Sequence, residues 1–252
     1  MNGEMYQICC ITVAAKNALK TKSKILYIPL KYEDKIEFHF LPEKGHKKNY
    51  KAESIVAWYD HCLKKDLQDV KIIFPVSVED RNILGFSNTT QSSLVCFWGS
   101  ALTYFSANCQ FDSYKKMWNT FYTEQEWKNA LPSKPEFKNN SENFKDVLIK
   151  IKELAFKIDC NYFAEIFQKA FNVLSGIDDI DNFNMSLPEI PEEHQRLFKA
   201  ASVADVFGAM GSWNDSPPYM AFEKGMVNEY NFLSGELLKQ IRLAILYAIN
   251  EW

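Results

Sequence analysis

Two aspartates and a glutamate in the C-terminal part of the chain could serve as acid–base groups or as ligands of a metal ion. Asp205 and Asp215 flank a short glycine-containing segment, and Glu223 follows them. Paired carboxylates can exchange protons with a substrate or hold a divalent ion when the fold brings them together. This pattern supports one alternative, a metal-assisted hydrolase that uses Asp205 and Asp215 with Glu223 as a further carboxylate.

The same segment, residues 204–215, also has a structural interpretation, which we favour. We expect Gly208 to end a helix in a left-handed conformation and Trp213 to anchor the following loop in the core. Asn214 or Asp215 would then form a side-chain turn before two consecutive prolines. In this interpretation the carboxylates hold the shape of a corner between helices and do not react.

Residues 206–215 read Val-Phe-Gly-Ala-Met-Gly-Ser-Trp-Asn-Asp. This segment resembles the C-terminal module of a family of small uncharacterised bacterial proteins, which carry Val-Phe-Gly-Gly-Met-Gly-Ser-Trp-Asn-Asp followed by a final amphipathic helix. The matching helix here is residues 237–250, and Ala209 replaces the second glycine. The resemblance leaves residues 1–190 unaddressed. It implies a protein-binding task such as toxin neutralisation, and it supplies no catalytic residues.

Acidic side chains dominate residues 178–223, which contain nine acidic and two basic residues interleaved with aromatic ones. Such a surface suits the capture of a basic protein partner, because opposite charges speed encounter and aromatic rings supply affinity. We therefore predict a protein-binding, immunity-like protein. The predicted binding residues are Asp178, Asp179, Asp181, Glu192, Glu193, Trp213, Asn214, Asp215 and Tyr219.

A lysine-rich loop between Lys44 and Lys51 offers a second alternative, a nucleic-acid binder, because clustered cations beside an aromatic ring can follow a phosphate backbone. Its members are Lys44, His46, Lys47, Lys48, Tyr50 and Lys51. The loop has no arginine, the side chain best suited to reading bases and phosphates. Because the net charge of the chain is −3, we favour a solvated loop and do not expect a nucleic-acid partner.

Signatures of cofactors and metals are missing from the sequence. It has no glycine-rich dinucleotide turn and no phosphate loop, and its four histidines lack the spacing of a zinc site. We therefore expect no cofactor and no metal, and lean against an enzyme. The six cysteines form no paired Cys-x-x-Cys elements, which favours reduced thiols and a cytoplasmic location. Outside the N-terminal stretch the longest apolar run is residues 243–249, too short to cross a membrane.

The charge of the chain changes sign along its length. Residues 1–130 have a net charge of +3 and residues 131–252 of −6. The change coincides with a proline-containing connector, Leu-Pro-Ser-Lys-Pro. We predict a mixed sheet domain over residues 1–131 and a helical domain over residues 141–252, which carries the Gly-Ser-Trp-Asn-Asp loop.

The pattern of apolar residues predicts an α+β fold. We expect an N-terminal mixed or antiparallel sheet with one or two helices, and a C-terminal four-helix layer or bundle. Strands are predicted over residues 25–30, 36–41, 70–78, 93–98, 102–111 and 116–122, and a helix over residues 52–67. Four further helices are predicted to begin near Ser141 (as an N-cap), Tyr162, Pro191 and Val227, because apolar residues then repeat at intervals of three and four. The segment before residue 20 fits the period of a helix and that of a strand.

Overall fold

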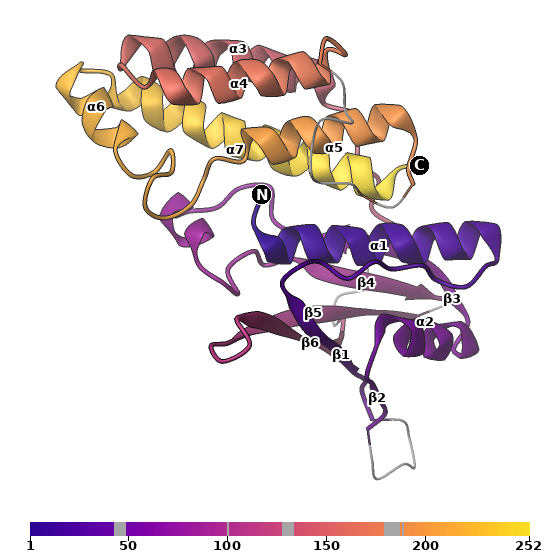
Figure 1. Ribbon diagram of the computed structural model, residues 1–252. Coiled ribbons are helices and arrows are strands. Elements are labelled where there is room, and N and C mark those ends of the chain that lie inside the picture. Colours follow the sequence, from indigo (N-terminus) through magenta and orange to yellow (C-terminus); the bar gives the residue numbers. More distant parts are fainter. Residues whose placement is uncertain (43–48, 100, 128–133, 179–186, 188) are drawn as a thin grey trace.

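The chain folds into a mixed sheet with α1 (Gly3–Thr21) and the C-terminal helices stacked above it and α2 (Ile55–Lys64) beside the strands, as seen in a computed structural model (Figure 1). The structure describes residues 1–42, 49–99, 101–127, 134–178, 187 and 189–252. Within this part of the chain there are six strands and seven α-helices, and the C-terminal half is helical. The predicted α+β fold class is therefore confirmed.

The sheet has the strand order β2-β1-β6-β5-β4-β3. The strands are β1 (Glu33–His39), β2 (Lys51–Ala52), β3 (Leu67–Ile73), β4 (Ser93–Trp98), β5 (Ala101–Asp112) and β6 (Met117–Glu126). β1 and β6 pair in parallel, while the other neighbouring strands are antiparallel. The predicted strands over residues 36–41, 70–78, 93–98, 102–111 and 116–122 all overlap strands of this sheet; the ends agree for residues 93–98 and are shifted for the others.

The helices pack either on the sheet or on one another. They are α1 (Gly3–Thr21), α2 (Ile55–Lys64), α3 (Ser141–Lys157), α4 (Asn161–Leu174), α5 (Glu192–Ala204), α6 (Pro217–Glu223) and α7 (Val227–Asn250), and a 3₁₀ helix, η1 (Arg81–Gly85), precedes β4. α3, α4, α5 and α7 pack side by side, which confirms the four predicted C-terminal helices (Figure 1). Across the described residues, none of the helices has the length and apolar character that a membrane crossing requires.

α1 and α2 both pack on one face of the sheet. Phe38 of β1 stacks on Trp58 of α2 with 4.7 Å between ring centroids. Phe38 also stacks on its cross-strand partner Tyr122, whose hydroxyl donates a hydrogen bond to Gln7 of α1. The aromatic side chains of this face therefore fix the two N-terminal helices over β1 and β6.

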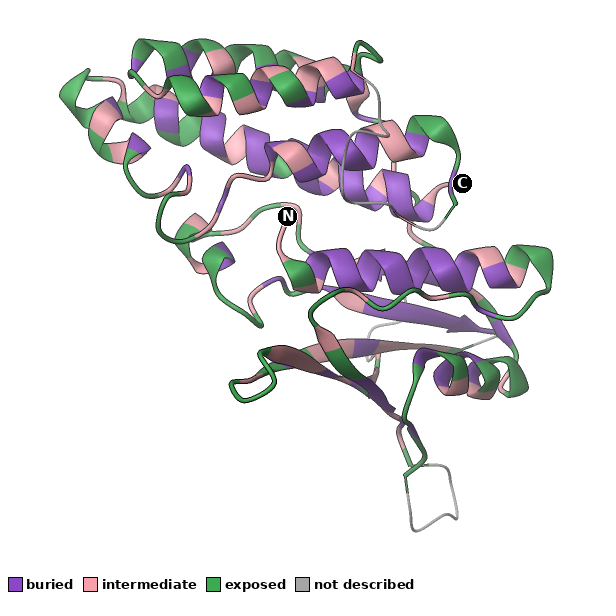
Figure 2. Ribbon diagram, in the orientation of Figure 1, coloured by how far each residue is buried: buried purple, intermediate pink, exposed green. Residues whose placement is uncertain are grey.

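α1 lies between the sheet and the C-terminal helices, and it contacts both β3 and α7 (Figure 2). Most of its residues are buried, so its apolar side chains are not confined to one stripe. For this reason the apolar residues of this segment fit both the period of a helix and the period of a strand. Buried hydrophobic residues of the sheet, α1 and α7 belong to one cluster; the division into domains of residues 1–131 and 141–252 stays a prediction.

Several predicted boundaries differ from the structure. Residues 25–30 are not a strand: they lie outside the sheet, and Leu26 and Ile28 are exposed. Ser141 is the first helical residue of α3 rather than its N-cap, and the preceding Asn140 donates hydrogen bonds from its side chain to Gln240 of α7. α6 was not predicted, although Pro217 stands at its first position, where the missing N–H costs nothing.

Candidate functional site

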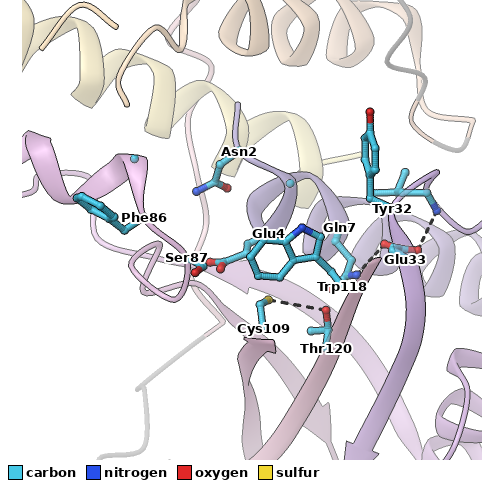
Figure 3. A pocket seen from close by; sticks show the side chains of 13 residues that line it. Asn2, Glu4, Gln7, Tyr32, Glu33, Phe86, Ser87, Cys109, Trp118 and Thr120 are labelled. Atoms are coloured by element: carbon cyan, nitrogen blue, oxygen red, sulfur yellow. Dashed lines mark hydrogen bonds between the residues drawn. The ribbon is translucent and has the colours of Figure 1, made fainter. Parts of the chain in front are cut away.

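A pocket of about 580 Å³ opens beside the N-terminus of α1 (Figure 3). Its walls come from the first turns of α1, the start of β1 and the segment before it, the end of η1 and the residues after it, and the strands β5 and β6. The lining residues are Asn2, Gly3, Glu4, Gln7, Leu30, Tyr32, Glu33, Gly85, Phe86, Ser87, Cys109, Trp118 and Thr120. A volume in this range is typical of sites for small ligands.

The chemistry of the pocket is acidic and aromatic. Glu4 and Glu33 are its carboxylates, and none of the thirteen lining residues is lysine, arginine or histidine. In the view of Figure 3 the indole of Trp118 lies between these two glutamates. Tyr32 and Phe86 stand at the edge and are more than half exposed. The pocket therefore combines two negative charges with aromatic surface, and none of its thirteen described lining residues supplies a compensating positive charge.

Glu33 is held by hydrogen bonds on both carboxylate oxygens. Oε1 accepts from Gln7 Nε2 at 2.6 Å and from the Tyr27 hydroxyl at 2.7 Å. Oε2 accepts from the Leu30 N–H at 2.8 Å and from the same hydroxyl at 2.9 Å. The buried amide of Gln7 is fixed in turn, because its Oε1 accepts from Tyr122 at 3.0 Å. Burial, together with the charge of Glu33, raises the pKa of Tyr27, so its hydroxyl remains a donor to this carboxylate.

Glu4 connects α1 to the loop that follows η1. Its Oε1 accepts from the Asn88 N–H at 2.5 Å. The Asn88 side chain pairs with the backbone of Cys109 in β5, accepting from its N–H at 2.7 Å and donating to its carbonyl at 3.1 Å. Asn88 has a φ of 62°, a left-handed conformation that asparagine tolerates better than most residues. Glu4 is thus positioned by the Asn88 N–H, and Asn88 is held in turn by the backbone of Cys109.

Cys109 forms part of the pocket lining but is unsuited to act as a nucleophile. Burial, followed by the negative charge of Glu4, raises the pKa of the Cys109 thiol to about 12. Because only the thiolate is nucleophilic, the side chain is unreactive near neutral pH. It faces Thr120 across the β5–β6 pair, with 3.7 Å between Sγ and Oγ1.

Alkylation by iodoacetamide at pH 8 is expected to discriminate between the cysteines of the folded protein. Cys160 is half-buried whereas Cys109 is buried with its thiol protonated, so Cys160 should be modified first. Peptide mapping by mass spectrometry over time checks the order. The unfolded protein is the control, in which both should react at similar rates. Equal rates in the folded protein would contradict the burial of Cys109.

The corner formed by residues 206–215 contacts η1, and the end of η1 forms one wall of the pocket. Asn214 Nδ2 donates to the Arg81 carbonyl of η1 at 2.9 Å. The α-carbon of Gly85, at the end of η1, lies so close to the corner that an added Cβ would be 2.4 Å from the Ala209 nitrogen. Since Phe86 and Ser87 follow Gly85 directly, the corner fixes one wall of the pocket.

Inside the corner, Trp213 is fully buried, which confirms its expected role as an anchor in the core. The expected left-handed cap at Gly208 is wrong: α5 ends at Ala204, and Gly211 is the glycine of this segment with a positive φ, 79°. The Asp215 carboxylate accepts from the Gly211 N–H at 2.8 Å, and this contact holds the left-handed turn.

Asp205 and Asp215 have different partners. Asp205 Oδ2 lies 3.7 Å from the amino group of Met1, whereas Asp215 holds the turn at Gly211. A pocket of about 30 Å³ beside Asp205 is lined by neither Asp215 nor Glu223, which is exposed on α6. Among the described residues there is no group of three His, Cys, Asp or Glu side chains that could hold a metal ion. No contact here favours the hydrolase alternative.

The predicted binding residues fall into two groups separated by α5. Glu192 and Glu193 are exposed at its first turn, where they contact Arg196 and Asn139, and Asp178 is half-buried. Trp213, Asn214, Asp215 and Tyr219 follow its other end. The 13 residues of α5 separate the groups by about 20 Å at 1.5 Å per residue. Tyr219 is exposed, but the buried Trp213 ring does not contribute to a surface. Asp179 and Asp181 lie outside the described residues.

Most of the lysine-rich loop, residues 44–48, also lies outside the described residues. At its end, Tyr50 stacks on His61 with 4.0 Å between ring centroids. Lys51 forms an ion pair with the buried Glu37 at 2.7 Å. Burial acts to raise the pKa of Glu37, but hydrogen bonds from Lys35, Lys51 and His39 lower it to about 2. Lys51 is therefore engaged within the sheet.

Comparison with known proteins adds no relative from which a role could be transferred. No protein-family model matches the chain, and no curated protein or solved structure matches it. The resemblance noted for residues 206–215 stays a prediction. The fold and the pocket define the protein as an α+β chain with an acidic, aromatic-lined pocket.

Proposed function

We propose that the protein binds a basic protein partner and takes a positively charged side chain of that partner into the pocket at the N-terminus of α1. The observation that carries the proposal is the charge of the pocket: Glu4 and Glu33 line it, and none of the lining residues that the structure describes is lysine, arginine or histidine. A cationic side chain would balance these carboxylates, and balancing buried charge is the usual condition for placing carboxylates in a partly dehydrated site.

Aromatic side chains around the pocket support the same proposal. Tyr32 and Phe86 are 60% and 62% exposed. Trp118 packs against Phe111, which is also exposed, with 5.1 Å between ring centroids. Exposed tyrosine, tryptophan and phenylalanine side chains around a concave centre are typical of protein interfaces, where they contribute most of the affinity.

An immunity-like protein, which neutralises a toxin by covering it, is the narrower form of this proposal. The pocket would hold a basic residue of the toxin, and the net charge of −3 would favour encounter with a basic surface. Relative to the sequence-based prediction, the proposed contact surface moves from the acidic residues around α5 to the pocket formed by α1, η1, β5 and β6.

Replacement of Glu4 by Gln should weaken the binding of a basic peptide. Glutamine retains an oxygen that accepts from the Asn88 N–H but removes one of the two negative charges. With blocked pentalysine as the probe, isothermal titration calorimetry at about 0.15 M salt, where exposed charges are screened beyond about 8 Å, should show at least a fivefold loss of affinity, about 1 kcal/mol.

Glu223→Gln is the matched control, because it removes the same charge from an exposed position on α6. It should leave the affinity within twofold of the unmodified protein. If both variants weaken binding equally, the peptide responds only to net charge and the proposed pocket is not its site. If pentalysine does not bind at all, or binds Glu4→Gln unchanged, the proposal is wrong.

A further inference from the structure

We infer that the partner segment which the pocket receives carries a single basic residue with apolar residues on both sides, and is not a polybasic stretch. This inference rests on the proposed function, since it names the sequence character of the segment that the pocket would bind. It follows from where the charges lie: the two carboxylates are inside the pocket, whereas aromatic rings, neutral groups and a lysine lie around its mouth.

Two exposed aromatic rings border the pocket on different walls. Phe86 belongs to the wall that follows η1, and Tyr32 belongs to the wall that precedes β1. In Figure 3 the two rings lie on opposite sides of Glu4 and Trp118. A segment whose cation reached Glu4 would therefore direct its flanking residues toward these rings. Apolar flanking side chains would cover the rings, and burial of about 40 Å² of apolar surface is enough for a fivefold gain in affinity.

The charges next to the pocket disfavour further basic residues on that segment. The ammonium of Lys31 lies 5.6 Å from the centroid of the Tyr32 ring. The nearby carboxylate of Asp34 accepts from Lys115 Nζ at 2.7 Å, so it is already paired. On the η1 side, the lining residues 85–87 are uncharged. A second lysine of the partner would face Lys31 or neutral groups, and like charges placed opposite each other weaken binding.

Apolar neighbours would also strengthen the attraction between the cation and Glu4. Leucine side chains over Tyr32 and Phe86 would exclude water from the mouth of the pocket, and opposite charges attract more strongly where water is excluded. Alanine side chains are too short to cover the rings, and lysine side chains would keep the mouth hydrated. Contacts that exclude water around a central residue are common in protein interfaces, even where they contribute little energy of their own.

Three pentapeptides with blocked ends test the inference: Leu-Leu-Lys-Leu-Leu, Ala-Ala-Lys-Ala-Ala and pentalysine. Each is titrated calorimetrically into the full chain at about 0.15 M salt, where exposed charges are screened beyond about 8 Å. The leucine peptide should bind at least fivefold more tightly than the alanine peptide, which carries the same charge, and more tightly than pentalysine. Because leucine occupies every flanking position, the result does not depend on the conformation of the bound segment.

Substitution of the two rings tests where the leucine side chains bind. Phe86→Ser should at least halve the advantage of the leucine peptide over the alanine peptide. Phe222→Ser is the matched control, because Phe222 on α6 is 66% exposed and Phe86 is 62% exposed; it should leave the advantage unchanged. Tyr32→Ser, with the exposed Tyr162→Ser on α4 as its control, repeats the test on the other wall and decides it if Phe86→Ser does not fold.

The outcomes separate this inference from the proposed function. If the alanine peptide or pentalysine binds at least as tightly as the leucine peptide, and Glu4→Gln weakens all three, the apolar flanks are overturned while the basic-partner function stands. If Phe222→Ser reduces the advantage of leucine as much as Phe86→Ser does, leucine binds exposed rings in general and the inference is overturned. If Glu4→Gln changes no affinity, or no peptide binds, the inference and the proposed function are both overturned.

Discussion

Replacement of Trp213 by alanine is expected to lower the free energy of unfolding by about 3–5 kcal/mol, the range for truncating a large buried aromatic side chain. The indole is fully buried and contacts the rings of Phe163, Phe167 and Tyr230 at 5.1–5.4 Å between centroids. Alanine would leave a cavity at the point where α4, α7 and the corner meet. Urea denaturation followed by circular dichroism measures the change.

The polar contacts of Trp213 provide a graded control. Its Nε1–H donates to the buried Ser234 hydroxyl at 2.8 Å. Ser234→Ala keeps the packing but removes that acceptor, and a buried donor left without a partner costs about 1–3 kcal/mol. We therefore expect Ser234→Ala to destabilise the protein, by less than Trp213→Ala. A loss below about 1 kcal/mol for Trp213→Ala would show that the corner does not anchor the helical layer.

Replacement of Gly85 by alanine is expected to separate η1 from the corner. The new methyl group would lie 2.4 Å from the Ala209 nitrogen and 2.7 Å from the Gly208 carbonyl carbon. Both atoms belong to the backbone, so relief requires one of the two segments to move. Forcing extra volume into a packed contact typically costs about 1–3 kcal/mol, measured by the same denaturation. Since Phe86 and Ser87 line the pocket next to Gly85, affinity for pentalysine should fall as well.

Gly3→Ala is the matched control for this substitution. Gly3 lines the same pocket and lies in the first turn of α1, but an added Cβ there meets no atom within 4 Å. Because alanine has a higher helix propensity than glycine, the variant should be as stable as the original protein or slightly more stable. If Gly85→Ala behaves like Gly3→Ala in both stability and peptide affinity, the close contact between η1 and the corner does not hold the pocket wall.

The spacing of apolar residues along the chain predicted best those elements that have one face toward the core. Apolar residues repeat at helical spacing in α3, α4 and α5, because one side of each helix packs on its neighbours while the other faces water. β4 was predicted with its observed ends, Ser93–Trp98, since its continuous apolar run is bounded by polar residues and Gly99. For these elements the spacing of apolar residues over a few positions is enough to predict the secondary structure.

Local pattern failed where packing decides between conformations. Residues 25–30 have strand propensity but lie outside the sheet, and α1 is buried against both the sheet and α7, so no amphipathic stripe marks it as a helix. The corner after α5 was recognised from its glycines and tryptophan. Its effect on the pocket was not, because that effect depends on Gly85 and Arg81, more than a hundred positions away in the chain.

The amino-acid sequence by itself determined the α+β class, the four C-terminal helices and the burial of Trp213. Only the tertiary structure decided where a ligand could bind. Glu4, Glu33 and Trp118 carry no motif, and they belong to α1, β1 and β6, which the parallel β1–β6 pairing and the packing of α1 bring together. The physical reason is that spacing along the chain reports burial on one element, whereas a pocket is formed by contacts between elements distant in sequence.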